Sequence, residues 1–241
     1  MARLLIILPQ SDFDPTEVAV PWTAWTDAGH DVVFATETGK AATCDAVTLT
    51  GQRLPFWARS LRAHDENAAL YRAMTCSPAF MAPLRWNDAR AADFAVIHFP
   101  GGHAPGMRPY LESAEVQRIA REAFAAGRPV SAICHGVIPL ARAGVLKGRK
   151  TTALTGLMEG VAVALTRSRL GQHYRTYPQS VETEVKAALT NPSDFDAGPL
   201  FPRYATQADP RAGFIVRDGN YVSARWPGDA WTLADEMLAR L

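Results

Sequence analysis

The stretch that decides the fold is VSAICHG, residues 130–136. Residues 129–133 form a short apolar run of the kind found in strands buried on both faces. Cys134 follows directly, and the small residues Ala132 and Gly136 allow the backbone to fold sharply into a helix. A nucleophilic side chain between strand and helix is the geometry of a nucleophile elbow, with cysteine in place of serine. Because free N–H groups at a helix start favour an anion, we expect a stabilised Cys134 thiolate.

Similar strand patterns lie on both sides of this stretch. Outward from the elbow, apolar runs predict strands at 4–8, 31–36 and 94–99, and residues 151–155 suit a further short strand. A helical pattern between the first two runs gives a β-α-β unit, which indicates a parallel sheet. The pair Asp218-Gly219 between two strand-like runs predicts a hairpin, and residues 229–241 predict a closing helix. The expected fold class is therefore α/β, with a mostly parallel central sheet.

The 241 residues are expected to form one domain, 1–241. The stretch 39–92 is less regular and is interpreted as a small cap insertion, because no linker-like composition flanks it. Residues 157–189 have a helical but ambiguous pattern. The proline-rich stretch 190–213 is expected to be an extended surface loop.

Composition narrows the classes of partner. The chain has 25 basic and 24 acidic residues, a net charge of +1, so neither nucleic acid nor a membrane is an expected partner. No apolar stretch approaches the ~20 residues of a membrane span, and residues 4–8 are too short for a signal-peptide core. Three cysteines without metal-like spacing favour a reducing cytoplasm over a disulfide framework. The six histidines show no ligand pairing in sequence, so no metal and no cofactor are expected.

Two further segments follow predicted strands. Gly101, Gly102 and His103 come after the strand at 94–99, and Glu17 comes after the first strand. In open parallel sheets the carboxyl ends of the strands meet at one edge, where ligands bind. The Gly102 N–H and the His135 N–H are therefore candidates for an oxyanion hole, with Gly101 and His103 beside the substrate. Taken alone, the glycines suit a plain turn, Glu17 suits a helix start and His103 suits a structural or rim position.

The combination of PGGH at 100–103, AICHG at 132–136 and the early Glu17 resembles the ThiJ/PfpI superfamily, of the class I glutamine amidotransferase-like fold. The resemblance implies a flavodoxin-like three-layer sandwich. It also implies Cys134 as nucleophile, His135 as its neighbour and Glu17 as a carboxyl group close to the thiol, where a protonated Glu17 would lower the pKa of the thiol. A small-molecule substrate and a homo-oligomer, most simply a dimer, are implied as well.

The chain departs from several branches of that superfamily. A His-x-Glu pair late in the chain, which true glutamine amidotransferases carry, is absent. Ala104 to Gly106 stand where the oligomeric proteases have a glutamate. In the capped branch an acidic residue after the next strand orients the histidine, which makes Glu159 a candidate partner for His135. The alternative for Glu159 is an exposed glutamate at a helix start.

The resemblance implies several activities and does not choose among them. The first interpretation is a cysteine-dependent hydrolase or lyase for a small carbonyl compound, of the glyoxalase or deglycase type, in which the Cys134 thiolate attacks. The first alternative is a stress-response chaperone or redox-sensing protein with an oxidisable Cys134. The second is an intracellular peptidase or amidase. A scaffold with an inherited but idle elbow stays open too.

Overall fold

A seven-stranded sheet forms the centre of the computed structural model, which describes residues 1–241. Its order is β5-β3-β1-β6-β7-β9-β8, and every neighbouring pair is parallel except the β8–β9 hairpin. The predicted parallel sheet and the predicted hairpin are therefore confirmed. The strands are β1 (Arg3–Ile7), β3 (Asp31–Thr36), β5 (Leu84–Arg85), β6 (Val96–Phe99), β7 (Val130–Ile133), β8 (Ile215–Asp218) and β9 (Tyr221–Ala224).

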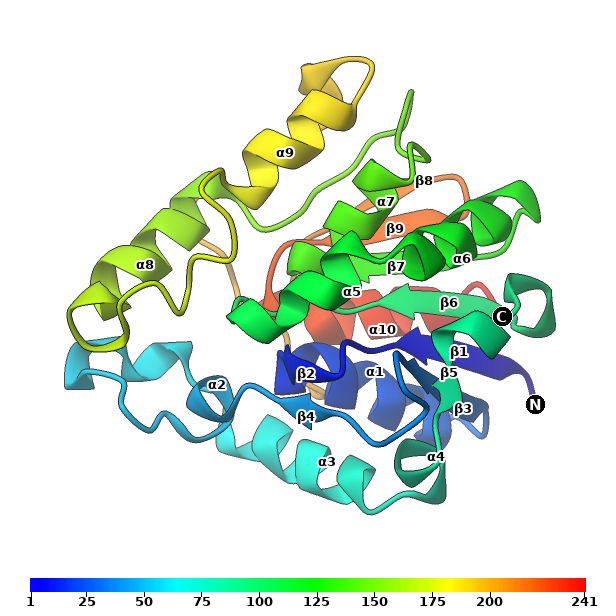
Figure 1. Cartoon of the computed structure of the whole chain (residues 1–241), viewed down its shortest axis with the longest axis horizontal. Coiled ribbons are helices and arrows are strands. Elements are labelled where there is room, and N and C mark those ends of the chain that lie inside the picture. Colours follow the sequence, from blue (N-terminus) through cyan, green and yellow to red (C-terminus); the bar gives the residue numbers. More distant parts are fainter.

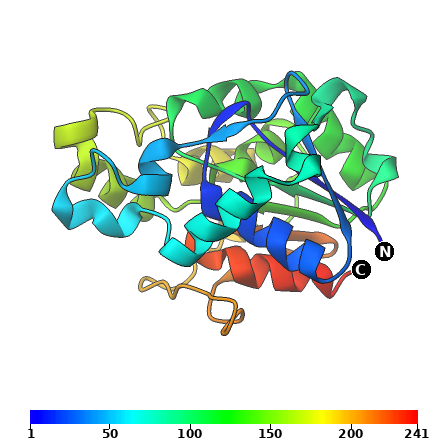
Figure 2. The same cartoon turned by 90° about the horizontal axis from the view of Figure 1, so that it is seen from below.

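Helices cover both faces of this sheet, so its central strands are fully buried. Figure 2 shows three layers, with the strands between two sets of helices. One set is α1 (Pro15–Asp27), α3 (Asp65–Thr75) and α10 (Ala230–Leu238), and the other includes α5 (Arg108–Glu112), α6 (Ala114–Ala125) and α7 (Ile138–Arg142). Leu4 to Ile7 have no exposed surface, which explains why the β1 run is apolar without alternation.

Helix α1 begins where its sequence signals place it. The Asp14 side chain accepts hydrogen bonds from the backbone N–H groups of Thr16 and Glu17, at 2.8 and 3.2 Å, and Pro15 occupies the first helical position. Because only the short segment 8–13 separates β1 from this cap, Glu17 lies near the carboxyl edge of the sheet.

Some short elements differ from the sequence prediction. The three residues of β2 (Ser11–Phe13) pair with β4 (Thr43–Cys44) in a separate small sheet, and the two-residue β5 extends the main one. Residues 151–155 were expected to suit a strand but form only an isolated bridge between Thr151 and Phe195. The reason is that the Thr152 N–H donates to the side-chain oxygen of Ser223, at 2.9 Å, instead of to a strand backbone.

The stretch 39–92 divides into two parts. Helix α3 packs on α1, α4 (Pro78–Met81) packs on β3, and β5 joins the sheet. Residues 45–64, called the cap segment below, contain α2 (Ala46–Thr50) and the 3₁₀ helix η1 (Phe56–Leu61). This segment lies beyond the carboxyl ends of the strands, next to α8 (Gly156–Leu170), as Figure 1 shows.

The remaining chain completes the second helical layer and the surface. The ambiguous stretch 157–189 is helical in two pieces, α8 and α9 (Val181–Ala188), and α9 packs on α7. The stretch 190–213 contains only the 3₁₀ turn η6 (Pro192–Asp194) and otherwise has no regular structure. None of the helices has both the length and the hydropathy that crossing a bilayer requires.

Candidate active site

Cys134 lies at a strained turn between β7 and the helical segment that follows. Its φ angle is +58°, a left-handed conformation that non-glycine residues seldom adopt and that stores about 1 kcal/mol or more. The backbone of Gly101 lies against this turn, because a Cβ at residue 101 would approach the His135 nitrogen to 2.7 Å and Cys134 Cβ to 2.9 Å. The strand end at Gly101 and the cysteine turn are therefore in direct contact.

The His135 imidazole is held between the thiol and a threonine. Cys134 Sγ lies 3.5 Å from His135 Nδ1, and Thr176 Oγ1 lies 3.1 Å from His135 Nε2. The Thr176 hydroxyl donates to the backbone carbonyl of His103 at 2.5 Å, so its oxygen accepts the Nε2 proton of His135. This network assigns the tautomer with an unprotonated Nδ1 facing the sulfur.

Thr176 is itself fixed by an arginine. Arg108 Nε and Nη2 donate to the Thr176 backbone carbonyl at 2.9 and 2.6 Å. Thr176 has no exposed surface, so its hydroxyl has no competing water. The orientation of His135 therefore depends on a loop that lies 41 residues further along the chain.

Glu17 lies on the other side of the cysteine. Its Oε2 accepts the Gly101 N–H at 2.8 Å, and its buried Oε1 has no hydrogen-bond partner. The Cys134 side chain lies beside the Glu17 carboxyl group. His98 fixes the backbone here, because its Nε2 lies 3.0 Å from the Glu17 carbonyl. Burial, and then the nearby Asp14, raises the pKa of Glu17 well above its ordinary value. A protonated Glu17 has an O–H that suits the sulfur as acceptor.

The resting thiol and imidazole are both neutral. Burial raises the pKa of the Cys134 thiol well above its ordinary value, the carboxyl groups of Glu17 and Asp14 raise it further, and the His135 backbone N–H opposes them. Burial, and then His103, lowers the pKa of His135 well below its ordinary value. The stabilised resting thiolate expected from the sequence is therefore wrong, because desolvation outweighs the helix N–H groups. The charged form of Glu17 raises the pKa of the thiol, whereas the lowering expected from the sequence belongs to the protonated form.

The structure brings together most of the residues that the sequence indicated, but not Glu159. Cys134, His135, Glu17, Gly101 and His103 all lie at the carboxyl ends of β1, β6 and β7. Glu159 is also buried, but its Oε2 accepts the Val181 N–H at 3.0 Å. The side chain hydrogen-bonded to His135 Nε2 is that of Thr176.

His103 is the residue of this group that reaches the surrounding space. Its ring centroid lies 5.0 Å from that of His135, and one ring nitrogen lies within 4.8 Å of ligand atoms of both Cys134 and His135. One sulfur and two nitrogens form a donor set that suits a soft or borderline cation such as Zn²⁺. The sequence showed no such pairing because the three residues come from two different strand ends. Burial lowers the pKa of His103 to about 4, so it is neutral at pH 7.

Thr176 is the residue that sequence reasoning missed. It belongs to a stretch between α8 and α9 whose local pattern carries no catalytic signal. A search for a hydrogen-bonding partner of His135 from the sequence favours acidic residues, which are the usual orienters. That the Thr176 hydroxyl orients His135 can be recognised only in the folded structure, where the loop that contains Thr176 lies beside the turn at Cys134.

Three comparisons with known proteins agree with one another. A family model described as ThiJ/PfpI family-like matches residues 8–199. The Deglycase PfpI of Pyrococcus furiosus is 28% identical over 238 residues, which are 98% of each chain. A glutathione-independent glyoxalase of Schizosaccharomyces pombe, hsp3101, is 26% identical over 93% of this chain and 87% of its own. The crystal structure of glyoxalase III from Candida albicans is 19% identical and superposes with a TM-score of 0.67, covering 100% of this chain and 97% of that one.

Proposed function

The chain belongs to the ThiJ/PfpI family, and on that premise we propose that it is a cysteine-dependent enzyme of the glyoxalase or deglycase type, which attacks a small carbonyl compound through Cys134. Relatives over nearly the whole chain are named as a deglycase and a glyoxalase. The observation that carries the proposal is the arrangement of Cys134, His135 and Thr176, in which an unprotonated imidazole nitrogen lies 3.5 Å from a thiol. That arrangement suits general-base activation of a sulfur nucleophile.

For an α-oxoaldehyde, R–CO–CHO, the reaction begins with attack of Sγ on the aldehyde carbon while the thiol proton passes to His135 Nδ1. The oxygen of the resulting hemithioacetal takes up negative charge, for which the N–H groups of Gly102 and His135 are the proposed donors. A proton then leaves the former aldehyde carbon and another adds to the keto carbon, which gives the thioester of an α-hydroxy acid. Water hydrolyses the thioester to R–CHOH–COOH and restores the thiol, so no external oxidant or reductant is needed.

Glu17 has a second role in this scheme. Its raised pKa favours the protonated form, and its carboxyl group lies beside the cysteine. In that state it donates a hydrogen bond to the sulfur or to the substrate oxygen, and it serves with His135 in the proton transfer between the two carbons. A charged Glu17 would instead repel the developing thiolate.

The burial of Cys134 favours the enzyme over the redox-sensing alternative. Cys134 has no exposed surface, whereas Cys76 is exposed. Peroxide therefore reaches Cys76 more readily than the thiol at the elbow. The buried position of Cys134 suits a substrate that is enclosed during reaction.

Product analysis tests the proposed function. Incubation with methylglyoxal should yield lactate by NMR, and Cys134→Ala should lower the rate by about a thousandfold or more. Cys76→Ala is the matched control, because Cys76 is exposed and far from the elbow in sequence, and it should turn over as the parent does. Full turnover by the Cys134→Ala protein would refute the proposal.

A further inference from the structure

A cavity of about 320 Å³ opens beside the active site. Its volume falls within the ~300–1,000 Å³ range of small-molecule sites. The walls come from three separate parts of the chain. They are the cap segment at Leu61, helix α8 at Leu157, Met158 and Ala162, and the stretch 190–213, called the C-terminal loop below, at Leu200. Apolar side chains make up most of this lining, which suits a hydrocarbon group and not a sugar or a phosphate.

The inner end of the cavity is polar and adjoins the thiol. His103 and Asp14 line this end, and a ring nitrogen of His103 lies within 4.8 Å of Cys134 Sγ. Asp14 caps helix α1 through the Glu17 N–H. Cys134 itself has no exposed surface and does not line the cavity. His103 is therefore the lining residue that connects the cavity with the sulfur.

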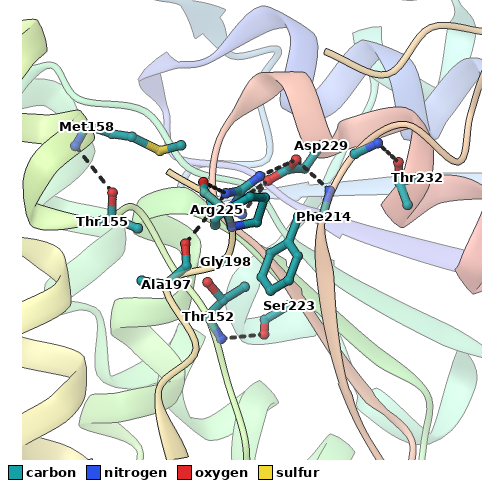
Figure 3. Close-up of polar contacts among 12 residues, drawn as sticks. Thr152, Thr155, Met158, Ala197, Gly198, Phe214, Ser223, Arg225, Asp229 and Thr232 are labelled. Carbon is teal, nitrogen blue, oxygen red and sulfur yellow. Dashed lines mark hydrogen bonds and ion pairs between the residues drawn. The ribbon is translucent and has the colours of Figure 1, made fainter. Parts of the chain in front are cut away.

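The wall formed by the C-terminal loop is held by a buried ion pair. Figure 3 shows Arg225 between Asp229 on one side and the loop at Ala197 on the other. Arg225 donates to the two Asp229 carboxylate oxygens at 3.0 and 3.2 Å and to the Pro199 carbonyl at 3.2 Å. Both charged side chains are fully buried. Because Arg225 bonds to Pro199, the backbone next to Leu200 is held in place.

The opposite wall is fixed by a helix cap, and the mouth is apolar. Thr155 Oγ1 accepts the Met158 N–H at 3.2 Å at the start of α8, a contact that Figure 3 also shows. At the mouth Leu157 and Leu200 are 58% and 66% exposed. Exposed apolar side chains that surround a cavity are typical of a binding site.

From these features we infer that the cavity binds the apolar substituent R of the substrate, so that the enzyme prefers α-oxoaldehydes with a ring or branched alkyl group over methylglyoxal. This inference rests on the proposed function and extends it to a substrate class. A methyl group leaves most of the cavity to water, whereas a cyclohexyl group buries its surface against α8 and the loop. Buried apolar area stabilises the bound state in proportion to its size, so the preference should be about tenfold or more in kcat/KM.

The test compares cyclohexylglyoxal with methylglyoxal for three proteins. The parent should prefer cyclohexylglyoxal by about tenfold or more in kcat/KM. Ala162→Phe places a ring in the cavity and should remove most of this preference. Ala164→Phe is the matched control, since Ala164 lies on the same helix but is exposed and does not line the cavity, and it should keep the preference. Thermal melting checks that each variant folds, and Leu157→Gln at the exposed mouth replaces Ala162→Phe if that protein does not fold.

Binding of cyclohexylglycolate, the product, separates this inference from the proposed function. Weaker binding to the Ala162→Phe or Leu157→Gln protein than to the Ala164→Phe protein, with no turnover of either aldehyde, would support the apolar site and refute the activity. Turnover of both aldehydes with equal kcat/KM, unaffected by the cavity variants, would overturn the inference and leave the activity standing.

Discussion

At the scale of single residues, the site is a neutral thiol and imidazole pair with a threonine behind it. Cys134 and His135 are both buried, and burial disfavours the charged form of each. An ion pair at rest is therefore not needed for the proposed chemistry. The thiol proton moves to Nδ1 as the sulfur attacks, and Thr176 keeps that nitrogen available.

Replacing Thr176 tests this positioning role. Thr176→Val removes the acceptor for His135 Nε2–H, and the imidazole then loses its fixed tautomer. We expect kcat to fall about tenfold, the equivalent of one net hydrogen bond, with little change in KM. The kcat–pH profile should shift as well, because His135 loses a partner for its Nε2 proton. Thr176→Ser keeps the hydroxyl and should restore most of the rate, whereas equal losses in the Val and Ser proteins would show that the hydroxyl does not sustain the rate and would contradict this role.

Alkylation of Cys134 against pH tests the direction of its pKa. Because burial and the neighbouring carboxyl groups raise the pKa of the thiol, the thiolate fraction is small at neutral pH. The rate of labelling by iodoacetamide, followed by peptide mass spectrometry, should still be rising above pH ~8.5, the midpoint of an ordinary thiol. The exposed Cys76 serves as the internal reference. A Cys134 midpoint below that of Cys76 would contradict the neutral pair.

At the scale of elements, the parts predicted correctly are those with a long apolar run or with residues typical of a turn. Residues 4–7 in β1, the Asp-Gly hairpin and the turn at Cys134 each carry a local physical reason for their conformation. The strands β2, β4 and β5 have only two or three residues, too few to show a period, and they form because neighbouring segments offer backbone partners. Thr176 and the cavity walls could not be predicted, because each depends on loops that meet only in the folded chain.

The cap segment is joined to the end of α8 by an ionisable pair. Asp45 caps α2 through the Val47 N–H, and its other oxygen lies 3.1 Å from His173 Nε2. The hydrogen bond that His173 donates to Asp45 raises the pKa of His173. Burial acts to raise the pKa of Asp45, but the hydrogen bonds from His173 and Thr48 outweigh it, so that pKa is lowered.

This pair gives the cap segment a pH dependence of defined sign. His173 is charged more readily in the folded state, so its contribution is full below the unfolded pKa of ~6.5 and is lost as pH rises through the folded value. Amide hydrogen exchange in residues 45–64 should therefore become faster, beyond its intrinsic pH dependence, as pH rises above ~6.5. His173→Gln should abolish this extra acceleration. The buried His103 and His135 have lowered pKa values and act in the opposite sense, so the comparison between the two proteins isolates His173.

At the scale of the whole molecule, a buried ion pair joins the C-terminal loop to the sheet and to α10. Asp229 accepts the Phe214 N–H at 2.8 Å in addition to its contacts with Arg225. The guanidinium also lies over the Phe214 ring, with 4.6 Å between its central carbon and the ring centroid. The pair thus connects the hairpin, the start of α10 and the loop that covers the cavity.

Breaking this pair should destabilise the fold strongly. Arg225→Leu leaves the Asp229 carboxylate buried without a cation, which costs about 3–5 kcal/mol in the free energy of unfolding. Urea denaturation of the parent and the Arg225→Leu protein measures this loss in the free energy of unfolding. Arg203→Leu is the matched control, because the Arg203–Asp209 pair is 72% and 57% exposed and should contribute no more than about 1 kcal/mol. Similar losses for the two substitutions would contradict the role given to the buried pair.

The central claim for the molecule is that its fold presents Cys134 as a covalent nucleophile, and acid quenching during turnover tests it most directly. With an α-oxoaldehyde in excess, the peptide that contains Cys134 should carry the mass of the α-hydroxyacyl thioester, and the peptides of Cys44 and Cys76 should not. The Cys134→Ser protein should show neither thioester nor turnover at the parent rate. Turnover at the parent rate by the Cys134→Ser protein, or turnover by the parent with no adduct on Cys134, would contradict the account.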